Sequence, residues 1–414
     1  MVKKIKSATS FPKEKIKILL AENVHQSAIE VFKRNGYTNI ESHKGAMNEA
    51  ELLQAAVHFH IVGIRSKTKL SKAFFEKANS LIAVGAFCIG TNQVDMNAAT
   101  NKGVSLFNSP YSNTRSVAEL TIAEAIMLMR RAIEKNAQLH QGVWNKESKN
   151  SFEIRGKTLG IIGYGHIGSQ VSILAEAVGM RVLFYDVVPR MVLGNAHACK
   201  SLSELLAASD VVTLHVPSLP STKNLIDASS IKQMKQGAKL INNARGDVAD
   251  LEAVAKALQS GRLGGYATDV FPYEPESNNE KFSSPLQQLP NVILTPHIGG
   301  STEEAQFNIG EDVAMKLVDF MDSGSSMGSL TIPELSLPLM QGTHRLLHIH
   351  RNVPGVLRDI NGILSSLKVN ILGQYLKTNN NVGYVVLDVD KKTSPKLISE
   401  LKTVSNTIKV RNLF

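Results

Sequence analysis

The chain has 414 residues, of which 43% are hydrophobic and 20% charged. That length favours two or three domains over a single core, and the composition is that of a globular protein. No uncharged apolar run approaches the length that spans a bilayer, so a membrane partner is not expected. The net charge of +10 comes from lysine and arginine scattered along the chain, without a basic block interleaved with aromatic residues. Nucleic acid is therefore a poor candidate partner, and an anionic metabolite is a better one.

The N-terminus and the cysteine content point to a cytoplasmic protein. The first residues lack the apolar segment of a secretion signal. Cys88 and Cys199 are the only thiols, and no His/Cys cluster has the spacing of metal ligands. A reducing compartment and a protein without a bound metal are the expectations.

The first hundred residues alternate short apolar strands with helices. This alternation predicts a parallel sheet covered on both faces. A long helix from Arg115 to about His140 follows, which Asn113 or Thr114 can cap. The expected strands are 16–20, 60–64, 81–86 and 104–107.

A glycine-rich turn near the middle of the chain carries the strongest functional signal. An apolar strand, 159–162, runs into Gly163, Gly165 and Gly168, and a helix opens there with His166 and Ile167. The three glycines permit the tight turn, the approach of a pyrophosphate and close helix packing, while the helix N-terminus receives phosphate charge. A second strand, 182–185, ends on Asp186, which can accept hydrogen bonds from a ribose 2′-OH. NAD is favoured, although the nearby Arg190 keeps NADP open.

The glycine turn comes only after the long helix, near the middle of the chain, which suggests that the nucleotide domain is inserted into another domain rather than leading the chain. Further strands and helices follow Asp186. A helix over 302–321 precedes a glycine- and serine-rich stretch, 322–329, and Pro333 and Pro338 mark a linker. The expected strands are 211–216, 239–242 and 292–294, and the expected helices are 202–208 and 251–259.

The tail has its own pattern. Strand, helix, strand, strand, helix and strand follow one another, which is the order of the ferredoxin-like unit. The expected strands are 344–350, 370–376, 383–389 and 408–413, with helices from Pro354-Gly355 and over 395–404.

Several blocks together resemble the D-2-hydroxyacid dehydrogenase family. They are Gly163 to Gly168 with Asp186, Asn242 to Asp247, Thr268 to Phe271 with Glu274-Pro275, and Thr295 to Gly300. Further blocks are similar to the serine-regulated branch of that family, which carries a C-terminal ACT domain: Ile64 to Thr68, Cys88 to Asp95, Phe107 to Glu119 and His348 to Gly355. The resemblance covers nearly the whole chain from about Lys15.

The resemblance implies an α/β fold in which a Rossmann-type NAD domain, 113–300, is inserted in a flavodoxin-like substrate domain, 1–112 and 301–335. A linker, 336–342, then leads to a ferredoxin-like ACT domain, 343–414. The implied activity is NAD-dependent oxidation of D-3-phosphoglycerate to 3-phosphohydroxypyruvate, the first step of L-serine synthesis, with feedback inhibition by L-serine. Reduction of 2-oxoglutarate is a further expectation, and a homotetramer is the implied assembly.

The resemblance also assigns the catalytic roles. His297 is the expected base, because imidazole titrates near neutrality, and Glu274 is expected to bond its other ring nitrogen. Arg245 is expected to hold the substrate carboxylate with its planar fork. Taken singly, such residues are more often a turn histidine, a solvated loop acid and an exposed turn arginine. Their occurrence together, in family order behind the glycine turn, favours catalysis.

The remaining site residues follow from the same resemblance. Asp269, Asn243, Ala244, Gly299 and Gly300 are expected at the nicotinamide end of the cofactor, although Asp269 can also be a strand-end cap. Arg65, Ser66 and Asn113 are the expected substrate-binding residues, to which Lys67 or a neighbouring subunit's Lys146 can add charge. Trp144 is expected at a dimer interface, with ordinary packing as the alternative.

In the tail, His350, Asn352 and Asn370 are the expected L-serine ligands, and turn or cap hydrogen bonding is the alternative. One departure concerns the hinge: bacterial relatives often carry paired glycines where this chain has Gln341-Gly342-Thr343. A stiffer hinge puts the strength of feedback control in doubt. Two other functions stay open, a dehydrogenase for a different 2-hydroxyacid and an NAD-sensing transcriptional corepressor.

Overall fold

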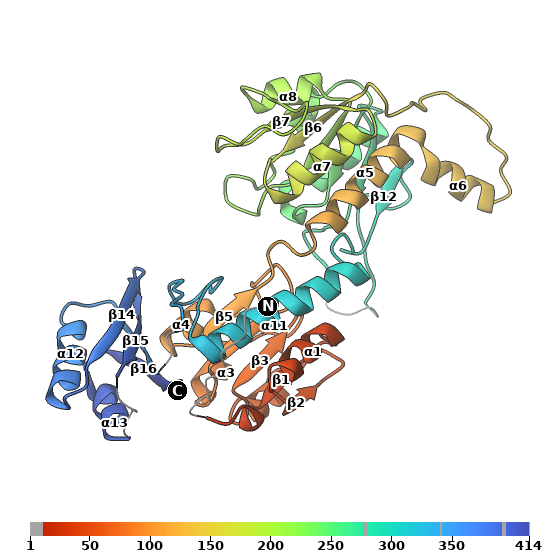
Figure 1. Cartoon of the computed structure of the whole chain (residues 1–414). Helices are drawn as coiled ribbons and strands as arrows, with labels where there is room; N and C mark the ends of the chain where they lie inside the picture. Colours follow the sequence, from red (N-terminus) through yellow and green to blue (C-terminus); the bar gives the residue numbers. More distant parts are fainter. Residues whose placement is uncertain (1–10, 276–279, 340–341, 391–394, 414) are drawn as a thin grey trace. The chain divides into compact units, whose positions relative to one another are not determined.

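The structure is a computed structural model that describes residues 11–275, 280–339, 342–390 and 395–413 (Figure 1). The chain folds into two compact units: Met1–Ser112 with Gln306–Phe414, and Asn113–Ala305. We call them the first and the second unit. The first holds two sheets, and the second holds one. The predicted domain ranges stay predictions, and Gln341 of the hinge lies outside the described residues.

A five-stranded parallel sheet in the order β2-β1-β3-β4-β5 forms one part of the first unit. All residues of β1, β3, β4 and β5 are buried, as expected for apolar strands covered on both faces. The edge strand β2 is polar and partly exposed, which is why its pattern gave no strand signal. The strands are β1 Ile18–Leu20, β2 Ile40–Ser42, β3 Ile61–Ile64, β4 Ala83–Ala86 and β5 Ser105–Asn108.

Helices cover both faces of this sheet. Ile18 and Leu20 pack in one core with residues of α1 and α11, whereas Leu19 packs in the other core with residues of α2, α3 and α4. This alternation along β1 follows from the two-residue period of a strand. The helices are α1 Gln26–Arg34, α2 Glu49–Ala55, α3 Lys72–Lys77, α4 Met96–Asn101 and α11 Glu303–Ser323, with a short 3₁₀ helix, η1 Lys13–Lys15.

The tail folds as a four-stranded antiparallel sheet in the order β14-β15-β13-β16, which confirms the predicted ferredoxin-like unit. One face of this sheet is covered by its two helices. Residues of the other face, including Leu347, Tyr384 and Val386, join the core that contains β1 and α11. The elements are β13 His344–Arg351, α12 Val356–Ser366, β14 Ile371–Thr378, β15 Val382–Val389, α13 Pro395–Thr403 and β16 Thr407–Asn412.

The second unit is built on a seven-stranded parallel sheet in the order β12-β11-β10-β9-β6-β7-β8. The order reverses direction at β6 and β9, as in a doubly wound nucleotide-binding fold. The strands are β6 Thr158–Ile162, β7 Arg181–Tyr185, β8 His197–Ala198, β9 Val211–Leu214, β10 Ala238–Asn242, β11 Leu263–Thr268 and β12 Val292–Leu294. The helices are α5 Thr114–Arg130, α6 Ala132–His140, α7 His166–Ala177, α8 Leu202–Ala208, α9 Ala228–Gln233 and α10 Leu251–Gln259, with η2 Gly246–Val248.

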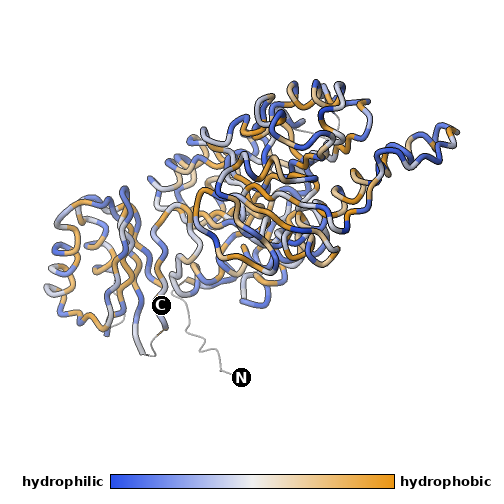
Figure 2. Tube along the Cα trace, turned by 90° about the horizontal axis from the view of Figure 1, so that it is seen from above, coloured by the Kyte–Doolittle hydropathy of each residue, from blue (hydrophilic) through white to orange (hydrophobic). Residues whose placement is uncertain are grey.

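The two α/β sheets and the ferredoxin-like sheet confirm the predicted fold class. Figure 2 shows the hydrophobic colour concentrated in the inner segments of the trace, with hydrophilic residues on its outer loops. Within the described residues, no helix combines the length and the apolar character needed to cross a membrane.

The prediction of one continuous helix from Arg115 to about His140 is wrong. The helix breaks at Arg131, whose φ of 51° is left-handed, and α6 starts immediately afterwards. The Arg131 guanidinium donates to both carboxylate oxygens of Glu134 on the new helix, at 2.8 and 2.7 Å. Asn113 does occupy the N-cap position of α5, but its side chain makes no capping hydrogen bond.

Strand β11 was missed by the sequence analysis because Gly264 and Gly265 have poor strand propensity. The structure explains the two glycines. A Cβ at Gly264 would clash with Lys239 and with the Gly237 carbonyl, and one at Gly265 would clash with Asn291. Close approach of neighbouring segments therefore requires glycine here.

A buried ion pair joins two strands of the antiparallel sheet. Arg345 in β13 donates from Nε and Nη2 to the two carboxylate oxygens of Asp388 in β15, both at 2.7 Å, and both side chains are fully buried. Its Nη1 donates to the carbonyls of Ser323 and Leu337, at 3.0 and 2.9 Å. The guanidinium therefore also fixes the segment that leads from α11 to the tail.

Removing the acid of this pair leaves an uncompensated buried charge. We expect Asp388→Ala to lower the free energy of unfolding by about 3–5 kcal/mol. Lys396→Ala, which breaks an exposed pair with Glu400, serves as the control and should change it by less than about 1 kcal/mol. Urea denaturation followed by circular dichroism measures both. Equal losses in the two variants would contradict a special role for the buried pair.

Candidate active site

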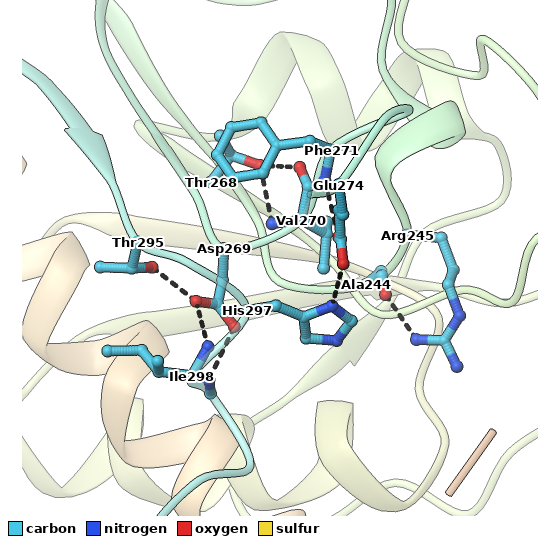
Figure 3. Close-up of polar contacts among 11 residues, drawn as sticks. Ala244, Arg245, Thr268, Asp269, Val270, Phe271, Glu274, Thr295, His297 and Ile298 are labelled. Atoms are coloured by element: carbon cyan, nitrogen blue, oxygen red, sulfur yellow. Dashed lines mark hydrogen bonds and ion pairs between the residues drawn. The ribbon is translucent and has the colours of Figure 1, made fainter. Parts of the chain in front are cut away.

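Three neighbouring parallel strands of the second unit end at the same edge of the sheet. β10 is followed by Arg245, β11 by Asp269 and Glu274, and β12 by His297. Since carboxyl ends of parallel strands meet at one edge, residues far apart in the chain come together there. Figure 3 shows these side chains around His297.

His297 and Glu274 form a hydrogen-bonded pair. The distance from His297 Nδ1 to Glu274 Oε2 is 2.8 Å. The hydrogen bond to Glu274 raises the pKa of His297 above its usual value, although burial opposes the shift. Burial also works against ionisation of Glu274, but the hydrogen bond and charge of His297 outweigh it and lower the pKa of that carboxyl. With Nδ1 donating to Glu274, Nε2 is left to exchange a proton with a substrate hydroxyl.

The turn that presents His297 is held by Asp269. The carboxylate accepts hydrogen bonds from Thr295 Oγ1 at 2.6 Å, from the Ile298 N–H at 2.8 Å and from the Gly299 N–H at 2.6 Å (Figure 3). His297 itself has a left-handed φ of 54°, which a non-glycine residue rarely adopts. Asp269 therefore does more than cap a strand.

Arg245 carries an exposed guanidinium. Its Nη1 donates to the Ala244 carbonyl at 2.6 Å, and the side chain is exposed. The following Gly246 is buried against Phe271, where a Cβ would clash with the backbone, so the arginine does not stand on a loose turn. A guanidinium held in this way can bind a carboxylate through two parallel hydrogen bonds.

The glycine turn between β6 and α7 is tightly packed on two of its three glycines. Gly163 has a φ of 92°, and a Cβ there would clash with the His215 carbonyl. A Cβ on Gly168 would clash with the Gly163 carbonyl, whereas the space beside Gly165 is open. Helix α7 starts at His166, with Ile167 next, and no side chain caps it. These features fit a pyrophosphate on the open helix N-terminus.

Asp186 ends β7 in a fixed position. Its carboxylate accepts the N–H groups of Tyr164 at 2.9 Å and Val188 at 3.0 Å, and it pairs with Arg190 at 3.1 Å. Burial alone would raise the pKa of Asp186, but these contacts outweigh it and lower the pKa. Because Arg190 is already engaged by this carboxylate, the geometry favours a ribose hydroxyl over a 2′-phosphate.

Behind the expected nicotinamide position lies a buried network that sequence reasoning missed. Asn243 donates from Nδ2 to Glu124 Oε2 at 2.7 Å and to Thr121 Oγ1 at 3.1 Å. Burial raises the pKa of Glu124 to about 8. The sequence does contain one sign of this network. Glu124 is an acidic residue on the apolar face of α5, which also carries the buried Ala118, Ile122 and Ala125.

Asn113 lies beside the loop after β12. A Cβ on Gly300 would clash with the Asn113 side chain, so the amide of Asn113 lies directly against the Gly300 backbone. The Oδ1 atom of Asn113 is buried and has no hydrogen-bond partner among the described residues. This position is consistent with the predicted substrate role of Asn113 and the predicted cofactor role of Gly300.

Arg65 and Ser66 belong to the first unit, where they follow β3. The backbone N–H groups of Arg65, Lys67 and Thr68 donate to the Glu22 carboxylate, at 3.1, 2.9 and 2.7 Å. Glu22 was not identified from the sequence, but it fixes this loop. The substrate role of Arg65 and Ser66 stays a prediction.

The predicted effector residues lie in or next to strands of the antiparallel sheet: His350 in β13, Asn352 after β13 and Asn370 before β14. His350 is buried, with Nδ1 at 2.7 Å from the Arg351 carbonyl and Nε2 without a partner among the described residues. Asn352 is exposed and donates to the Asn379 carbonyl at 2.7 Å. Asn370 is exposed, and its N–H donates to Asp390 at 3.0 Å. Their role in binding an effector stays a prediction.

Comparisons with known proteins agree with this geometry. Residues 122–299 match the model of the NAD-binding domain of D-isomer specific 2-hydroxyacid dehydrogenases, and residues 346–409 match an AHAS small subunit-like ACT domain. A D-lactate dehydrogenase of Aquifex aeolicus, solved with NAD and lactic acid, superposes with a TM-score of 0.66 at 27% identity, covering 77% of this chain and 100% of that one. Fold and site thus define an NAD-dependent D-2-hydroxyacid dehydrogenase.

Curated relatives narrow the class. D-3-phosphoglycerate dehydrogenase of Haemophilus influenzae is 55% identical over 405 residues, covering 98% of this chain and 99% of the relative. The Escherichia coli enzyme of that name is 52% identical over 407 residues, with the same coverage. D-3-phosphoglycerate dehydrogenase 1 of Saccharomyces cerevisiae is 46% identical, covering 100% of this chain and 91% of the relative. The chain belongs to the D-3-phosphoglycerate dehydrogenase family.

The His297–Glu274 pair predicts a specific pH dependence. Reduction of the ketone needs a protonated imidazole, so its rate falls as pH rises through the pKa of His297. Because Glu274 raises that pKa, Glu274→Gln should move the fall in rate to lower pH. The measurement is kcat for ketone reduction by NADH as a function of pH.

Glu304→Gln is the matched control, since Glu304 is an exposed carboxylate of the same unit. It should leave the profile unchanged. A Glu274→Gln profile that coincides with that of the parent protein would show that Glu274 does not set the titration of His297.

Proposed function

We propose that this chain oxidises D-3-phosphoglycerate to 3-phosphohydroxypyruvate with NAD, the first step of L-serine synthesis. The observation that carries the proposal is the His297–Glu274 pair near an exposed Arg245, in a chain 55% identical to a D-3-phosphoglycerate dehydrogenase. Reduction of 2-oxoglutarate to 2-hydroxyglutarate is a second proposed activity. It is supported by the same arginine fork, which recognises a carboxylate next to the reacting carbon.

In this proposal the three catalytic side chains divide the work. NAD, when bound, accepts the hydride from the substrate carbon. Nε2 of His297 takes the hydroxyl proton, and the Glu274 carboxylate stabilises the imidazolium that results. Arg245 holds the substrate carboxylate and polarises the developing carbonyl.

Cofactor contacts are assigned to residues around the glycine turn and the nicotinamide end. Asp186 would receive the ribose hydroxyls and the N-terminus of α7 the pyrophosphate. The further proposed contacts are Gly163, Gly165, His166, Ile167, Gly168, Asn243, Ala244, Asp269, Gly299 and Gly300.

The substrate phosphate is assigned to Arg65 and Ser66, with Asn113 near the reacting end. The loop of Arg65 is fixed by Glu22, which supports a preorganised anion site. Lys67, or Lys146 from a neighbouring subunit, is proposed to add positive charge.

Regulation and assembly complete the proposal. L-serine is assigned to His350, Asn352 and Asn370 of the ACT domain, where the unpartnered Nε2 of His350 supports a ligand contact. A homotetramer is proposed, supported by the exposed apolar side chains of Leu139, Val143 and Trp144, the last 78% exposed. A cytoplasmic location also belongs to the proposal.

The first test follows NADH consumption with 3-phosphohydroxypyruvate while L-serine is titrated in. We expect turnover, and we expect L-serine to suppress it. Turnover that L-serine leaves untouched would remove the effector assignment and keep the enzyme. An absence of turnover would overturn the proposed activity.

The phosphate assignment has a separate test. Because a charge-assisted hydrogen bond contributes about 1.5–3 kcal/mol, Arg65→Ala should lower kcat/KM for 3-phosphohydroxypyruvate roughly 10- to 100-fold. The loss on 2-oxoglutarate should be smaller. Arg34→Ala, an exposed arginine of the same unit, is the control. Equal losses on both substrates would contradict the assignment.

A further inference from the structure

The turn after β10 is fixed by two consecutive asparagines. Asn242 closes the turn on itself, since its side chain donates to the Arg245 carbonyl at 3.0 Å and accepts the Ala244 N–H at 3.1 Å. Asn243 instead ties the turn to helix α5, because its amide donates to the Glu124 carboxyl at 2.7 Å. The position of the turn that carries Arg245 therefore depends in part on an acid of α5.

Glu124 is fully buried, and its Oε2 accepts the hydrogen bond from Asn243. Its Oε1 has no hydrogen-bond partner among the described residues. In that part of the chain it also forms no ion pair with a cation, and the charge that acts on it is the carboxylate of Asp269. Burying an ionised carboxyl beside a like charge is costly, whereas a neutral carboxylic acid avoids most of that cost.

A second atom of this contact is also left unsatisfied. Asn243 Oδ1 is buried and has no hydrogen-bond partner among the described residues. A proton on Glu124 Oε1 turns that atom into a donor, and Oδ1 is an acceptor on the amide already bonded to the same carboxyl. An ionised Glu124 has no proton to donate, so it leaves both oxygen atoms without a partner.

The surroundings of Glu124 supply no neutralising charge. Helix α5 packs against β10, β11, β12, α6 and α7. Lys239 lies at the other end of β10, where it donates to the Gly237 carbonyl at 2.7 Å, and burial raises the pKa of Tyr266 in β11 to about 12, so that it stays neutral. The other titratable side chains of these helices are His166 and Glu176 of α7, Glu134, Lys135 and His140 of α6, and Arg115, Glu119 and Arg130 of α5 itself.

Helix α5 also lies against the loop that presents His297. A Cβ built on Gly299 would be 3.6 Å from the side chains of both Val117 and Leu120, and 2.9 Å from Asp269 Oδ2. The buried network of α5 and the Asp269 carboxylate thus approach the same short stretch of backbone. A change of charge on Glu124 is therefore felt at the site and not only inside the helix packing.

We propose that Glu124 is a positioning residue for the nicotinamide end of the cofactor site, which as a neutral acid pairs with the Asn243 amide through both of its oxygens and as an anion favours the oxidised cofactor. This inference rests on the proposed function, in which Asn243, Asp269 and Gly299 line that end of the site. The oxidised nicotinamide ring carries a positive charge and the reduced ring does not. A negative charge behind the ring therefore strengthens binding of NAD⁺ relative to NADH.

The sign of the pH effect follows from the environment of Glu124. Burial raises the pKa of Glu124 to about 8, the hydrogen bond from Asn243 opposes this shift, and the charge of Asp269 adds to it. Glu124 is therefore neutral below about pH 8 and ionised above it. The preference for NAD⁺ over NADH should rise as pH increases through about 8.

The first test measures the ratio of the Kd for NADH to the Kd for NAD⁺ on the full chain, at about pH 6.5 and about pH 9.5. NADH binding is followed by its fluorescence, and NAD⁺ binding by displacement of NADH. We expect the ratio of the parent protein to rise about 3-fold or more with pH. Glu124→Gln should lack this rise, because its amide has the shape of the neutral acid and cannot ionise.

Glu252→Gln is the control, since Glu252 is an exposed carboxylate of the same unit. Its ratio should follow that of the parent protein. Titration of His297 contributes to all three proteins, so the difference between parent and Glu124→Gln is the informative quantity. A ratio that rises equally in Glu124→Gln would overturn the proposal.

Infrared spectroscopy tests the proton on Glu124 without any cofactor. A protonated carboxyl has a C=O stretching band that a carboxylate lacks. We expect such a band at neutral pH, its loss as pH rises through about 8, and its absence from Glu124→Gln. Labelling glutamate with ¹³C shifts the band in the parent protein, which identifies it even where the variant does not fold. A parent protein without the band at neutral pH would contradict the neutral acid.

The two measurements separate this inference from the proposed function. A protein that binds neither NAD⁺ nor NADH would overturn the proposed function, and the infrared band would still decide the protonation of Glu124. Binding of both cofactors at a ratio that does not change with pH would keep the proposed function and overturn the link between Glu124 and the nicotinamide.

Discussion

The geometry of the proposed catalytic site depends on the hydrogen bonds of the Asp269 carboxylate. This carboxylate binds one hydroxyl and two backbone N–H groups of the loop after β12, and that loop presents His297 in a left-handed conformation. Such a backbone conformation costs of order 1–3 kcal/mol and persists only where surrounding contacts hold it in place. Asp269, which directly follows β11, makes these contacts, and β11 is the strand adjacent to β12.

The rest of the site follows from the edge where β10, β11 and β12 end together. Glu274 settles the tautomer of His297 and raises its pKa, while Arg245 keeps its guanidinium exposed and supported by Gly246. Behind them, Glu124 is buried and accepts a hydrogen bond from Asn243, and it forms no ion pair with a cation in the part of the chain that the structure describes. The site thus combines a charged pair that is partly solvated with a buried acid that burial favours as neutral.

The first unit contains buried cationic side chains with and without a carboxylate partner. Arg345 is fully buried and fully compensated, because Asp388 faces it bidentately and backbone carbonyls take its remaining donors. Lys409 and Arg411 lie two residues apart on β16 and form no ion pair with a carboxylate of the described residues. Lys409 donates to the Leu81 carbonyl, and the Arg411 guanidinium lies over the Phe320 ring. One sheet thus holds a buried cation paired with a carboxylate and two cations whose partners are a carbonyl and an aromatic ring.

The sequence by itself determined the features that depend on local patterns. The glycine turn with Asp186, the buried parallel strands and the order of elements in the tail are all encoded by apolar period and turn chemistry over short stretches. The roles of Arg245, Glu274 and His297 came from resemblance, since a single Glu-Pro or Thr-Pro-His carries no chemistry alone. Only the tertiary structure decided the rest: the break at Arg131, the strand through Gly264 and Gly265, the Glu124–Asn243 contact and the buried Arg345–Asp388 pair. Each of these depends on which distant segment lies alongside, and close approach and desolvation leave no periodic mark in the chain.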